Sequence, residues 1–460
     1  MTSRVAPPEP CATHVGTLIV GGGAAGLIAA LSAVEAGEEV LVLERDPVPS
    51  GSTALSAGLI PAAGTRFQAA AGIADDADLF AADIQRKARN RNDPALVALM
   101  TRSAAPVIEW LADRHGLEFS LVADFDYPGH SRRRMHGLPG RSGRELIDAL
   151  RSAAEAVGVD ILTEARVDTL FADAGRIHGV ALTRPDGSVE RVGCDRLILA
   201  CNGFGGNRAL VAEHMPEIAG ALYFGHPGNT GEAMLWGRAL GAEIRHPGAY
   251  QGHGNVAHPH GILITWAVIT GGGFQVNRAG RRFWNEAQGY SEAARAVQAQ
   301  PGGQAVTVFD ERIAAIARQF ADFRAAEAQG AIRRAETPAA LAAAFDLPPD
   351  AFAATFAEVE AAKTGRGADP FARAFAGVPA LTSPFLGVRV TAALFHTQGG
   401  LAVDDQARVR RARGGVFRNL LAAGGAACGV SGADDAGYLS GNGLLAAVTL
   451  GHRAGSAALR

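Results

Sequence analysis

The feature that most constrains this chain is a glycine-rich turn between an apolar strand and a helix, close to the N-terminus. Residues 17–20 read TLIV, the turn GGGAAG follows at 21–26, and LIAALSAVEAG and EEVLVLER then have the patterns of a helix and a second strand. Gly21, Gly23 and Gly26 have the spacing G-x-G-x-x-G, and Glu44 lies eighteen residues after Gly26 at the end of the second strand. This unit predicts a Rossmann-like dinucleotide-binding fold.

Each position of the turn has its own physical role. Gly21 permits the tight turn, Gly23 lets the backbone approach a pyrophosphate, and Gly26 lets helix and strand pack closely. The N–H groups at the start of the helix, at Ala24 and Ala25, carry partial positive charge toward the phosphates. Glu44 can only accept hydrogen bonds, which suits free ribose hydroxyls and disfavours the 2′-phosphate of NADP. The turn alone does not choose between NAD and FAD.

The rest of the chain predicts two domains of an α/β protein. Helical periodicity at 75–115 and 143–157 is followed by a β-meander at 159–200, and strands resume from 391 before a helix from about 443. Between them the pattern is irregular. We therefore expect a disordered lead-in at 1–15, a discontinuous nucleotide domain at 16–242 plus 391–460, and an inserted α+β capping domain at 243–390.

Composition excludes several classes of partner. The 460 residues carry a formal net charge of -3 with no long run of either sign, which indicates neither nucleic acid nor an anionic membrane as a partner. Cys11, Cys194, Cys201 and Cys428 are scattered without the spacing of a metal or haem site. The sequence contains no run of about eighteen apolar residues, the length that would indicate membrane insertion. We expect a soluble, cytoplasmic protein.

Four further segments resemble the fumarate reductase and succinate dehydrogenase flavoprotein superfamily. They are GSTALSAG at 51–58, ACNGFGGN at 200–207, HTQGG at 396–400 and YLSGNG at 438–443, supported by NTGE at 229–232 and GRRFWNE at 280–286. The resemblance implies FAD as cofactor and a substrate held between the FAD domain and the cap. Ser52 stands where covalent members have a flavin-linking histidine, so the FAD is expected to be non-covalent. Gly424-Gly425 departs from the Gly-Glu of many relatives.

The resemblance and the turn together give the expected cofactor-binding residues. They are Gly21, Gly23, Ala24, Ala25, Gly26, Glu44, Arg45, Ser52, Thr53, Ser56, Gly58, Val167, Ala200, Asn202, Gly203, Asn207, Glu232, Gly424, Asn442, Gly443, Leu444 and Leu445. The helix that starts within 441–445 would place its positive end near the part of the flavin that becomes negative on reduction.

Two tyrosines stand where dicarboxylate reductases of this superfamily have substrate-binding arginines, at Tyr290 and Tyr438. A dianion needs that positive charge, so fumarate or succinate should bind poorly. Tyrosines at both positions resemble the 3-ketosteroid dehydrogenases, and Tyr438-Leu-Ser440 resembles the 4(5α) type. The resemblance implies desaturation beside a ketone, with Tyr438 removing the α-proton, Ser440 relaying it and Tyr290 donating to the carbonyl oxygen. The turn at 441–443 could assist as an oxyanion hole.

Other residues leave the substrate open. His396 resembles the histidine that contacts a carboxylate in the dicarboxylate enzymes, and a cyclic keto acid would reconcile it with the tyrosines and with Arg132, Arg133 and Arg134. That arginine triplet could equally be a solvated loop. His253, His258 and His260 have no acidic or cysteine partner nearby, which favours a loop without metal. The electron acceptor is external and unidentified, and a carboxylate-directed reductase or a non-catalytic flavoprotein subunit stays an alternative.

Overall fold

A computed structural model describes residues 3–123, 126–375 and 377–458. The chain divides into two compact units, which are described separately here. The first unit takes in residues 1–214, 225–250 and 396–460, and the second takes in 215–224 and 251–395. The main part of the second unit, 251–395, begins later than the cap expected at 243–390. The second unit also includes the short segment 215–224, which precedes the expected cap.

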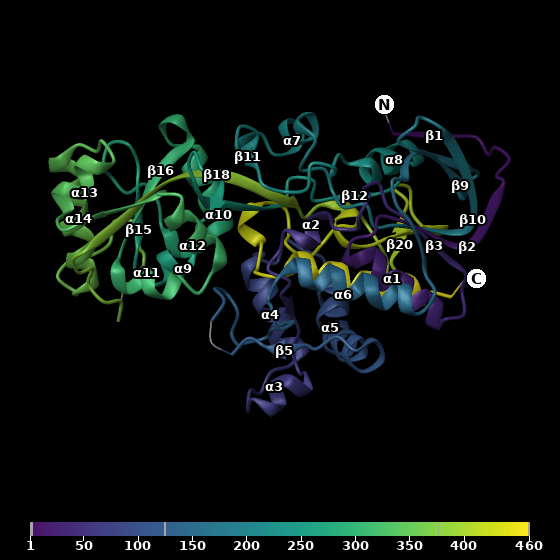
Figure 1. Ribbon diagram of the computed structural model, residues 1–460, viewed down its shortest axis with the longest axis horizontal. Helices are drawn as coiled ribbons and strands as arrows, with labels where there is room; N and C mark the ends of the chain where they lie inside the picture. The colour runs from purple at the N-terminus through teal and green to yellow at the C-terminus, as the bar shows by residue number, and fades with distance from the viewer. Residues whose placement is uncertain (1–2, 124–125, 376, 459–460) are drawn as a thin grey trace. The chain divides into compact units, whose positions relative to one another are not determined.

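The first unit is built on a nine-stranded mixed sheet (Figure 1). Its main order is β1-β8-β9-β10-β2-β3-β7, and β21 pairs with β10 and with β20. The pairs β10-β2, β2-β3 and β3-β7 are parallel, whereas β8, β9 and β10 form the antiparallel meander that the sequence predicts. The strands are β1 Arg4–Ala6, β2 Thr13–Val20, β3 Val40–Leu43, β7 Asp160–Leu162, β8 Arg166–Asp173, β9 Arg176–Thr183, β10 Val189–Leu199, β20 Arg408–Arg410 and β21 Val416–Ala422.

The N-terminal lead-in, expected to be disordered, is partly a strand. β1 pairs in parallel with β8 at the edge of the sheet, and Arg4 donates from Nε to Thr169 Oγ1 at 2.9 Å. β2 begins at Thr13, three residues before the expected start of the domain at 16. Backbone pairing at a sheet edge, with few apolar side chains, gives little sequence signal, which explains the error.

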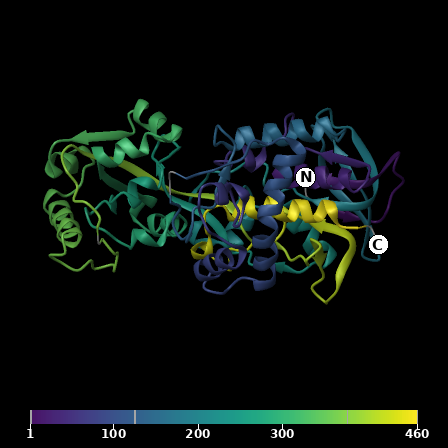
Figure 2. The same cartoon turned by 90° about the horizontal axis from the view of Figure 1, so that it is seen from below.

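Three helices from distant parts of the chain lie side by side in the first unit: α1 (Ala24–Glu35), α6 (Gly143–Ala156) and α15 (Asn442–Ser456) (Figures 1 and 2). Gly451 and Gly455 of α15 face α1, where a β-carbon at Gly451 would lie 2.6 Å from the carbonyl oxygen of Ala25. The absence of side chains lets the two helices approach closely, so the C-terminal segment completes the N-terminal nucleotide fold.

The other helices of the first unit frame this core. They are α2 Gly51–Ala54, α3 Arg66–Ala70, α4 Ala77–Lys87, α5 Pro94–His115, α7 Arg208–His214 and α8 Glu232–Leu240. Among the described helices, α5 alone is long and apolar enough to cross a membrane, with a mean hydropathy of 1.3. Its Met100, Ile108 and Leu111 are buried in the core of the unit. Two small sheets, β4-β6-β5 and β12-β19, complete the unit; the strands are β4 Ile60–Pro61, β5 Ser120–Leu121, β6 Met135–Gly137, β12 Ile244–Arg245 and β19 Gly400–Leu401.

The second unit is a seven-stranded sheet with helices around it. Its order is β14-β13-β18-β16-β15, and β11 and β17 also pair with β18. The strands are β11 Leu222–Tyr223, β13 Tyr250–Ala257, β14 Ile262–Leu263, β15 Phe274–Val276, β16 Gln304–Asp310, β17 Ile332–Ala335 and β18 Phe385–Thr397. The helices are α9 Ala267–Thr270, α10 Tyr290–Gln298, α11 Glu311–Ala317, α12 Ala321–Ala328, α13 Pro338–Ala344 and α14 Pro349–Lys363. This is the α+β composition expected for a capping domain.

The glycine- and histidine-rich segment at 250–261 is not the loop that the sequence suggested. Residues 250–257 form β13, beside β18 in the sheet, and His253 is only 5% exposed within it. His258 and His260 follow the strand and are exposed. Glycine and histidine give this segment a weak strand signal. The strand forms through buried packing in the sheet rather than through the β propensity of its residues.

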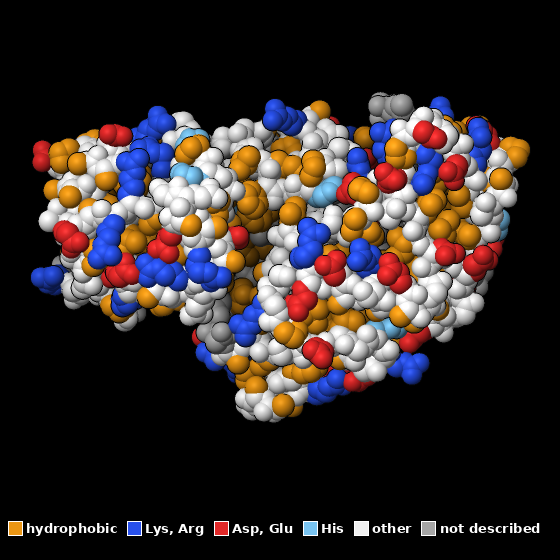
Figure 3. All heavy atoms as spheres, in the orientation of Figure 1, with side chains coloured by type: hydrophobic (Ala, Val, Ile, Leu, Met, Phe, Trp, Pro, Cys, Tyr) orange, Lys and Arg blue, Asp and Glu red, His pale blue; other side chains and the backbone are white. Residues whose placement is uncertain are grey.

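On the face of the molecule shown in Figure 3, acidic and basic side chains are interspersed.

Candidate functional site

The turn between β2 and α1 has the close packing that its glycines require. Gly21 has φ +108, and a β-carbon on it would lie 2.5 Å from the carbonyl oxygen of Ala200. A β-carbon on Gly26 would overlap the carbonyl oxygen of Gly21. Gly23 differs, since a β-carbon there would meet only Thr53 Oγ1, at 3.6 Å. Gly21 and Gly26 are thus demanded by the protein itself, whereas Gly23 leaves space for an approaching ligand.

The N-terminus of α1 is open for an anion. Its N-cap, Gly23, provides no side-chain cap, and among the first N–H groups that of Ala24 donates to a side chain, Thr53 Oγ1 at 3.1 Å. Ala25 follows at the same end and is buried. A helix of 12 residues with uncapped N–H groups presents both hydrogen-bond donors and the positive end of its dipole.

Glu44 is held beside this turn. Its Oε2 accepts from the N–H of Gly22 at 2.7 Å and its Oε1 from the N–H of Asp46 at 2.9 Å, and the residue is 7% exposed. A carboxylate has about four acceptor positions, so two stay available for a ribose hydroxyl. Nearby, Arg45 donates to the carbonyl oxygen of Gly228 at 2.5 Å and lies 3.7 Å from Glu232, so two expected cofactor residues meet here.

Ser52 ties three expected cofactor segments together. Its Oγ accepts from the side-chain amides of Asn202 and Asn229, each at 2.9 Å. Asn202 has φ +63, and its Oδ1 accepts from the N–H of Gly203 at 2.8 Å. No histidine stands at this position to form a covalent link. Ser52, in α2, therefore links the loop after β10 to the segment before α8.

The adjoining loop after Ser52 is equally constrained. Ser56 donates to the carbonyl oxygen of Thr53 at 2.7 Å and accepts from the N–H of Gly58 at 3.0 Å. A β-carbon on Gly58 would lie 2.5 Å from the carbonyl oxygen of Ser142. Gly424, which lies outside this loop and just after β21, is similarly confined, since a β-carbon on it would lie 2.9 Å from Ala25. Ser56 and Gly58 shape the backbone of the loop rather than offering free side chains.

Two expected cofactor residues have protein partners of their own. Asn207 donates to the carbonyl oxygen of Thr230 at 3.0 Å and accepts from the N–H of Leu210 at 3.2 Å, close to the start of α7. Val167 and Ala200 are buried, on β8 and directly after β10. Their participation in cofactor binding stays a prediction.

Tyr438 lies just before α15, and its side chain turns back onto the start of that helix. The backbone N–H groups of Gly443 and Gly441 hydrogen-bond the phenol oxygen. Burial raises the pKa of Tyr438 well above its usual value, and these two hydrogen bonds oppose that rise without cancelling it. The turn at 441–443, which we considered as an oxyanion hole, therefore serves the phenol in this structure.

The start of α15 also carries an unsatisfied acceptor. Asn442 is fully buried, its Nδ2 donates to Ser431 Oγ at 2.9 Å, and its Oδ1 has no hydrogen-bond partner among the described residues. Leu445 is buried and Leu444 half-buried. A buried acceptor without a partner is costly unless a ligand provides a donor. Together with the open N-terminus of α1 and the bare Gly23, it fits a flavin dinucleotide.

His396, at the end of β18, lies against Tyr438. The two ring centroids are 5.6 Å apart with an interplanar angle of 77°. His396 Nδ1 lies 3.0 Å from the side-chain amide of Gln398, and burial lowers the pKa of His396 to about 4. The imidazole is thus neutral at physiological pH, and it can donate a hydrogen bond but cannot supply the positive charge of an arginine.

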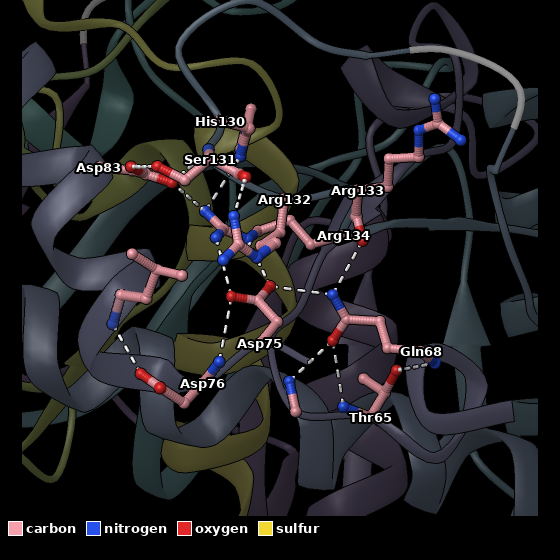
Figure 4. A network of polar contacts seen from close by, with 12 residues as sticks. Thr65, Gln68, Asp75, Asp76, Asp83, His130, Ser131, Arg132, Arg133 and Arg134 are labelled. Carbon is pink, nitrogen blue, oxygen red and sulfur yellow. Dashed lines mark hydrogen bonds and ion pairs between the residues drawn. The ribbon is translucent and has the colours of Figure 1, made fainter. Parts of the chain in front are cut away.

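Ser440 is connected to a buried ionic cluster. Figure 4 shows the cluster, with His130 and Arg134 beside Asp75 and Asp83. Its carbonyl oxygen lies 3.0 Å from Nε2 of His130, and Nδ1 of His130 lies 3.4 Å from Arg134. Arg134 makes a two-pronged pair with Asp75, at 2.8 and 2.9 Å, and a further pair with Asp83 at 2.6 Å. The cluster anchors the segment that carries Tyr438.

The arginine triplet is therefore not a single set. Arg134 has a fully buried side chain, whereas Arg132 and Arg133 are exposed. Because two carboxylates hold Arg134, it is not available for a substrate carboxylate. The suggestion that the triplet binds a keto acid is wrong for Arg134, and a solvated loop describes only its two neighbours.

The remaining buried guanidinium groups are also occupied. Besides Arg134, the described residues include three buried arginines. Arg196 donates to Thr17 at 2.8 and 3.0 Å and to carbonyl oxygens of α15 and its end, and Arg282 and Arg373 both contact Glu286, at 2.7 and 3.1 Å. No buried arginine of the described chain is left for a dianion.

Tyr290 belongs to the second unit, where it is the first residue of α10. Its ring stacks on His253, with centroids 5.1 Å apart and an interplanar angle of 16°. The stack continues through Phe395 at 5.5 Å to Phe224 at a further 5.0 Å, and Trp266 lies edge-on to His253. The sequence placed Tyr290 in the site but missed this aromatic stack, because its members are far apart along the chain.

His253 is the main residue that sequence reasoning overlooked. Its Nδ1 is buried and has no hydrogen-bond partner among the described residues, and burial lowers its pKa to about 3. A buried ring nitrogen without a partner is uncommon in folded proteins, and a ligand group that donates to it would satisfy it. The available signal was a histidine on an alternating segment, Gln251-Gly-His-Gly-Asn255, which we interpreted as a loop.

Comparisons with known proteins identify the family of this chain. Residues 16–444 match the model of a family described as FAD binding domain. An NADH:fumarate oxidoreductase of Klebsiella pneumoniae is 30% identical over 96% of this chain, which spans 47% of that relative's length. A 4-oxocyclohexanecarboxylate 2-dehydrogenase of Sinomonas cyclohexanicum is 26% identical, and the match covers 89% of this chain and 87% of that relative's length.

Solved structures show the same fold. The open conformation of a flavocytochrome c3 fumarate reductase has a TM-score of 0.82 and 28% identity, covering 97% of this chain and 78% of its own. The 3-ketosteroid-delta4-(5alpha)-dehydrogenase of Rhodococcus jostii RHA1 has a TM-score of 0.80 and 23% identity over the full length of both chains. The predicted α/β fold and the superfamily resemblance are both confirmed.

Proposed function

This chain belongs to the FAD binding domain family and is an FAD-dependent oxidoreductase of the fumarate reductase type, and we propose that it desaturates a cyclic ketone that carries a carboxylate. The observation that carries the proposal is the buried phenol of Tyr438 at the start of α15, where a dicarboxylate enzyme would need an arginine. The proposal commits to one of the two ketone classes that the sequence left open.

The cofactor would be held non-covalently by the first unit. The uncapped N-terminus of α1 would receive its pyrophosphate, Glu44 its ribose, and the start of α15 its ring system. The chemistry that FAD would supply when bound is acceptance of a hydride from the carbon β to the carbonyl, with the electrons leaving to an external acceptor. All the protein groups assigned to this task lie in residues 21–58, 167–232 and 424–445.

Tyr438 would exchange the α-proton of the substrate. A carbonyl acidifies its α-hydrogens, and the phenolate oxygen is a strong enough base to remove one. The N–H groups of Gly441 and Gly443 stabilise that phenolate, while burial favours the neutral phenol. The same phenol can return a proton in the reverse reaction, so Tyr438 serves both directions. Ser440 would pass the proton onward.

His396 would hold one polar end of the substrate, and Tyr290 stays the residue predicted for the ketone oxygen. Tyr290 would donate to the ketone oxygen and so stabilise the negative charge that grows there as the α-proton leaves. The neutral His396 would donate to a carboxylate oxygen. A single carboxylate can be bound by neutral donors, whereas two carboxylates call for guanidinium groups, and the buried ones are engaged.

The substrate class draws support from a relative. The protein named 4-oxocyclohexanecarboxylate 2-dehydrogenase aligns with most of this chain, and its name describes a six-membered cyclic ketone with one carboxylate. We assign this chain to the same class. A second candidate is reduction of an unsaturated dicarboxylate, which the name of the 30% identical relative favours. That reaction would require a positively charged group other than the four buried arginines.

The test is anaerobic bleaching of the purified yellow holoenzyme. We would add 4-oxocyclohexanecarboxylate, cyclohexanone, a 3-ketosteroid and succinate in separate experiments, and identify products by mass spectrometry. Bleaching is expected first with the keto acid, with loss of two hydrogens from it. Tyr438→Phe should abolish bleaching, whereas the matched variant Tyr223→Phe, on β11, should not. Bleaching by succinate alone would refute the proposal, and no bleaching by any compound would favour a non-catalytic flavoprotein.

A further inference from the structure

A chain of buried side-chain hydrogen bonds leads from the start of α15 to the ring of His396. Asn442 Nδ2 donates to Ser431 Oγ at 2.9 Å, and Ser431 Oγ donates to Gln398 Oε1 at 2.7 Å. Gln398 Nε2 then donates to His396 Nδ1 at 3.0 Å. Asn442, Ser431 and Gln398 are 0%, 1% and 5% exposed, so water does not compete for these bonds. All four residues lie in the first unit.

The bonds run in one direction. Because Gln398 Oε1 accepts from Ser431, its NH₂ end faces His396, and Nδ1 must then offer a lone pair. A neutral imidazole has one ring proton, which is therefore on Nε2. Nδ1 also lies 3.3 Å from the carbonyl oxygen of Thr397, which can only accept, but this contact is longer than the one with Gln398.

The opposite direction would also link all four residues, but it is disfavoured at the far end. If every amide turned over, Asn442 would leave a buried NH₂ group, rather than Oδ1, without a protein partner. Asn442 is the first residue of α15, where the N-terminal end of the helix dipole gives a partial positive charge. An acceptor oxygen is favourable there and an NH₂ group is not. The helix end therefore selects the observed direction.

Backbone packing fixes the ring in place. A β-carbon on Gly443 would lie 2.9 Å from His396 Cε1 and 3.1 Å from Nε2, so the ring fits closely over the helix start. Nε2 has no hydrogen-bond partner among the described residues, and the His396 side chain is half-buried. This nitrogen is thus the one left for a substrate.

We propose that Gln398, Ser431 and Asn442 are positioning residues that keep the ring proton of His396 on Nε2, so that His396 is a fixed hydrogen-bond donor to a substrate oxygen. The relay assigns His396 a role that its sequence pattern alone leaves open. The donor role rests on the proposed function, but the position of the proton does not. A fixed donor selects an anionic or carbonyl oxygen and rejects a ligand group that can only donate.

The test begins without substrate. Holoenzyme labelled with ¹⁵N-histidine would be examined by NMR at neutral pH, with His396→Asn used to identify the His396 ring signals. We expect a protonated Nε2 and an unprotonated Nδ1. Gln398→Leu and Ser431→Ala should mix the two tautomers, whereas Gln406→Leu, the same change at a turn outside the relay, should leave the spectrum of His396 unchanged. A wild-type ring with its proton on Nδ1 would overturn the proposal.

Gln398→Glu provides the opposite perturbation. A carboxylate accepts from Nδ1–H, so the proton should move to Nδ1 and the pKa of His396 should rise from about 4. With a bleaching substrate, Gln398→Leu should lower kcat/KM about tenfold, the effect of roughly one hydrogen bond. Gln398→Glu should add a new ionisation to the pH profile, which a merely structural role would not do. If no ketone bleaches the flavin but the Nε2 tautomer is found, the proposed function fails and the relay stands.

Discussion

At the scale of the single residue, the protonation state of Tyr438 sets the chemistry. The N-terminus of α15 beside this tyrosine acts to favour the phenolate. The two N–H groups are present, yet burial outweighs them and the pKa of Tyr438 is raised. Desolvation of a whole phenol opposes ionisation more strongly than two backbone dipoles favour it. The residue is therefore a neutral phenol at physiological pH, and it needs a deprotonated fraction to act as a base.

A pH dependence follows from this raised pKa. In desaturation the reactive form is the phenolate, so the rate of flavin reduction by a ketone should rise about tenfold per pH unit throughout the neutral and mildly alkaline range. The reverse reaction uses the neutral phenol and should be nearly flat over the same range. Stopped-flow measurements of flavin reduction between about pH 6 and pH 9 would check this. A plateau near neutrality in the desaturation direction would contradict the assignment.

At the scale of the element, the two later glycines of the first turn have separable roles. A β-carbon on Gly26 overlaps the carbonyl oxygen of Gly21, whereas one on Gly23 meets only Thr53 at 3.6 Å. Gly26→Ala should therefore lower stability and yield, because strand and helix must move apart. Gly23→Ala should fold normally but lose FAD, because the methyl group stands where the pyrophosphate approaches. Thermal melting and the ratio of flavin to protein absorbance would distinguish the variants, and a yellow Gly23→Ala protein would be the contrary result.

The ionic cluster around Arg134 supports a second prediction at this scale. Removing the arginine would leave Asp75 and Asp83 buried without their counter-charge, which typically costs about 3–5 kcal/mol. Arg134→Met should thus lower the free energy of unfolding strongly. Arg133→Met, next to it but exposed, should change it little. Denaturant titration of both variants would measure the difference, and equal effects would show that burial is not the cause.

The same cluster gives stability a pH dependence. Burial acts to raise the pKa of Asp83, but hydrogen bonds from Ser131, Arg134 and Arg86 outweigh it and lower the pKa to about 2. A carboxyl with a lowered pKa stabilises the fold above its ordinary pKa and loses that effect as the pH falls toward the lowered value. In wild type the contribution should disappear between about pH 4 and pH 2, and in Arg134→Met it should already be reduced at higher pH.

Which parts of the site were predictable depends on how local their cause is. The turn at 21–26, Glu44 and the start of α15 are fixed by neighbours in sequence, so pattern and resemblance identified them. His253 was missed because β13 is stabilised by its neighbours in the sheet rather than by its own propensity. Arg134 was grouped with two exposed arginines because its partners, Asp75 and Asp83, are more than fifty residues away. Such distant pairs leave no trace in a single sequence.

At the scale of the whole molecule, the two units divide the assigned roles unequally. Every expected cofactor-binding residue, together with Tyr438 and His396, lies in the first unit, and Tyr290 with its aromatic stack lies in the second. The comparisons establish the family over 16–444, so both units belong to one flavoprotein fold. A bound cofactor, however, stabilises first the unit that it contacts.

Hydrogen–deuterium exchange of the apoprotein and the holoenzyme would test this division. FAD should slow exchange in peptides that include the turn after β2, the loop at 51–58 and the start of α15, because a ligand suppresses the local openings of its own site. Peptides from 251–395 should change much less. Ser52→Ala is a useful companion, since it removes the acceptor shared by Asn202 and Asn229 and should weaken protection at 51–58, 200–207 and 229–232 alone. Equal protection of both units by FAD would instead mean that they open as one cooperative body, and the roles assigned to the first unit alone would then have to be shared.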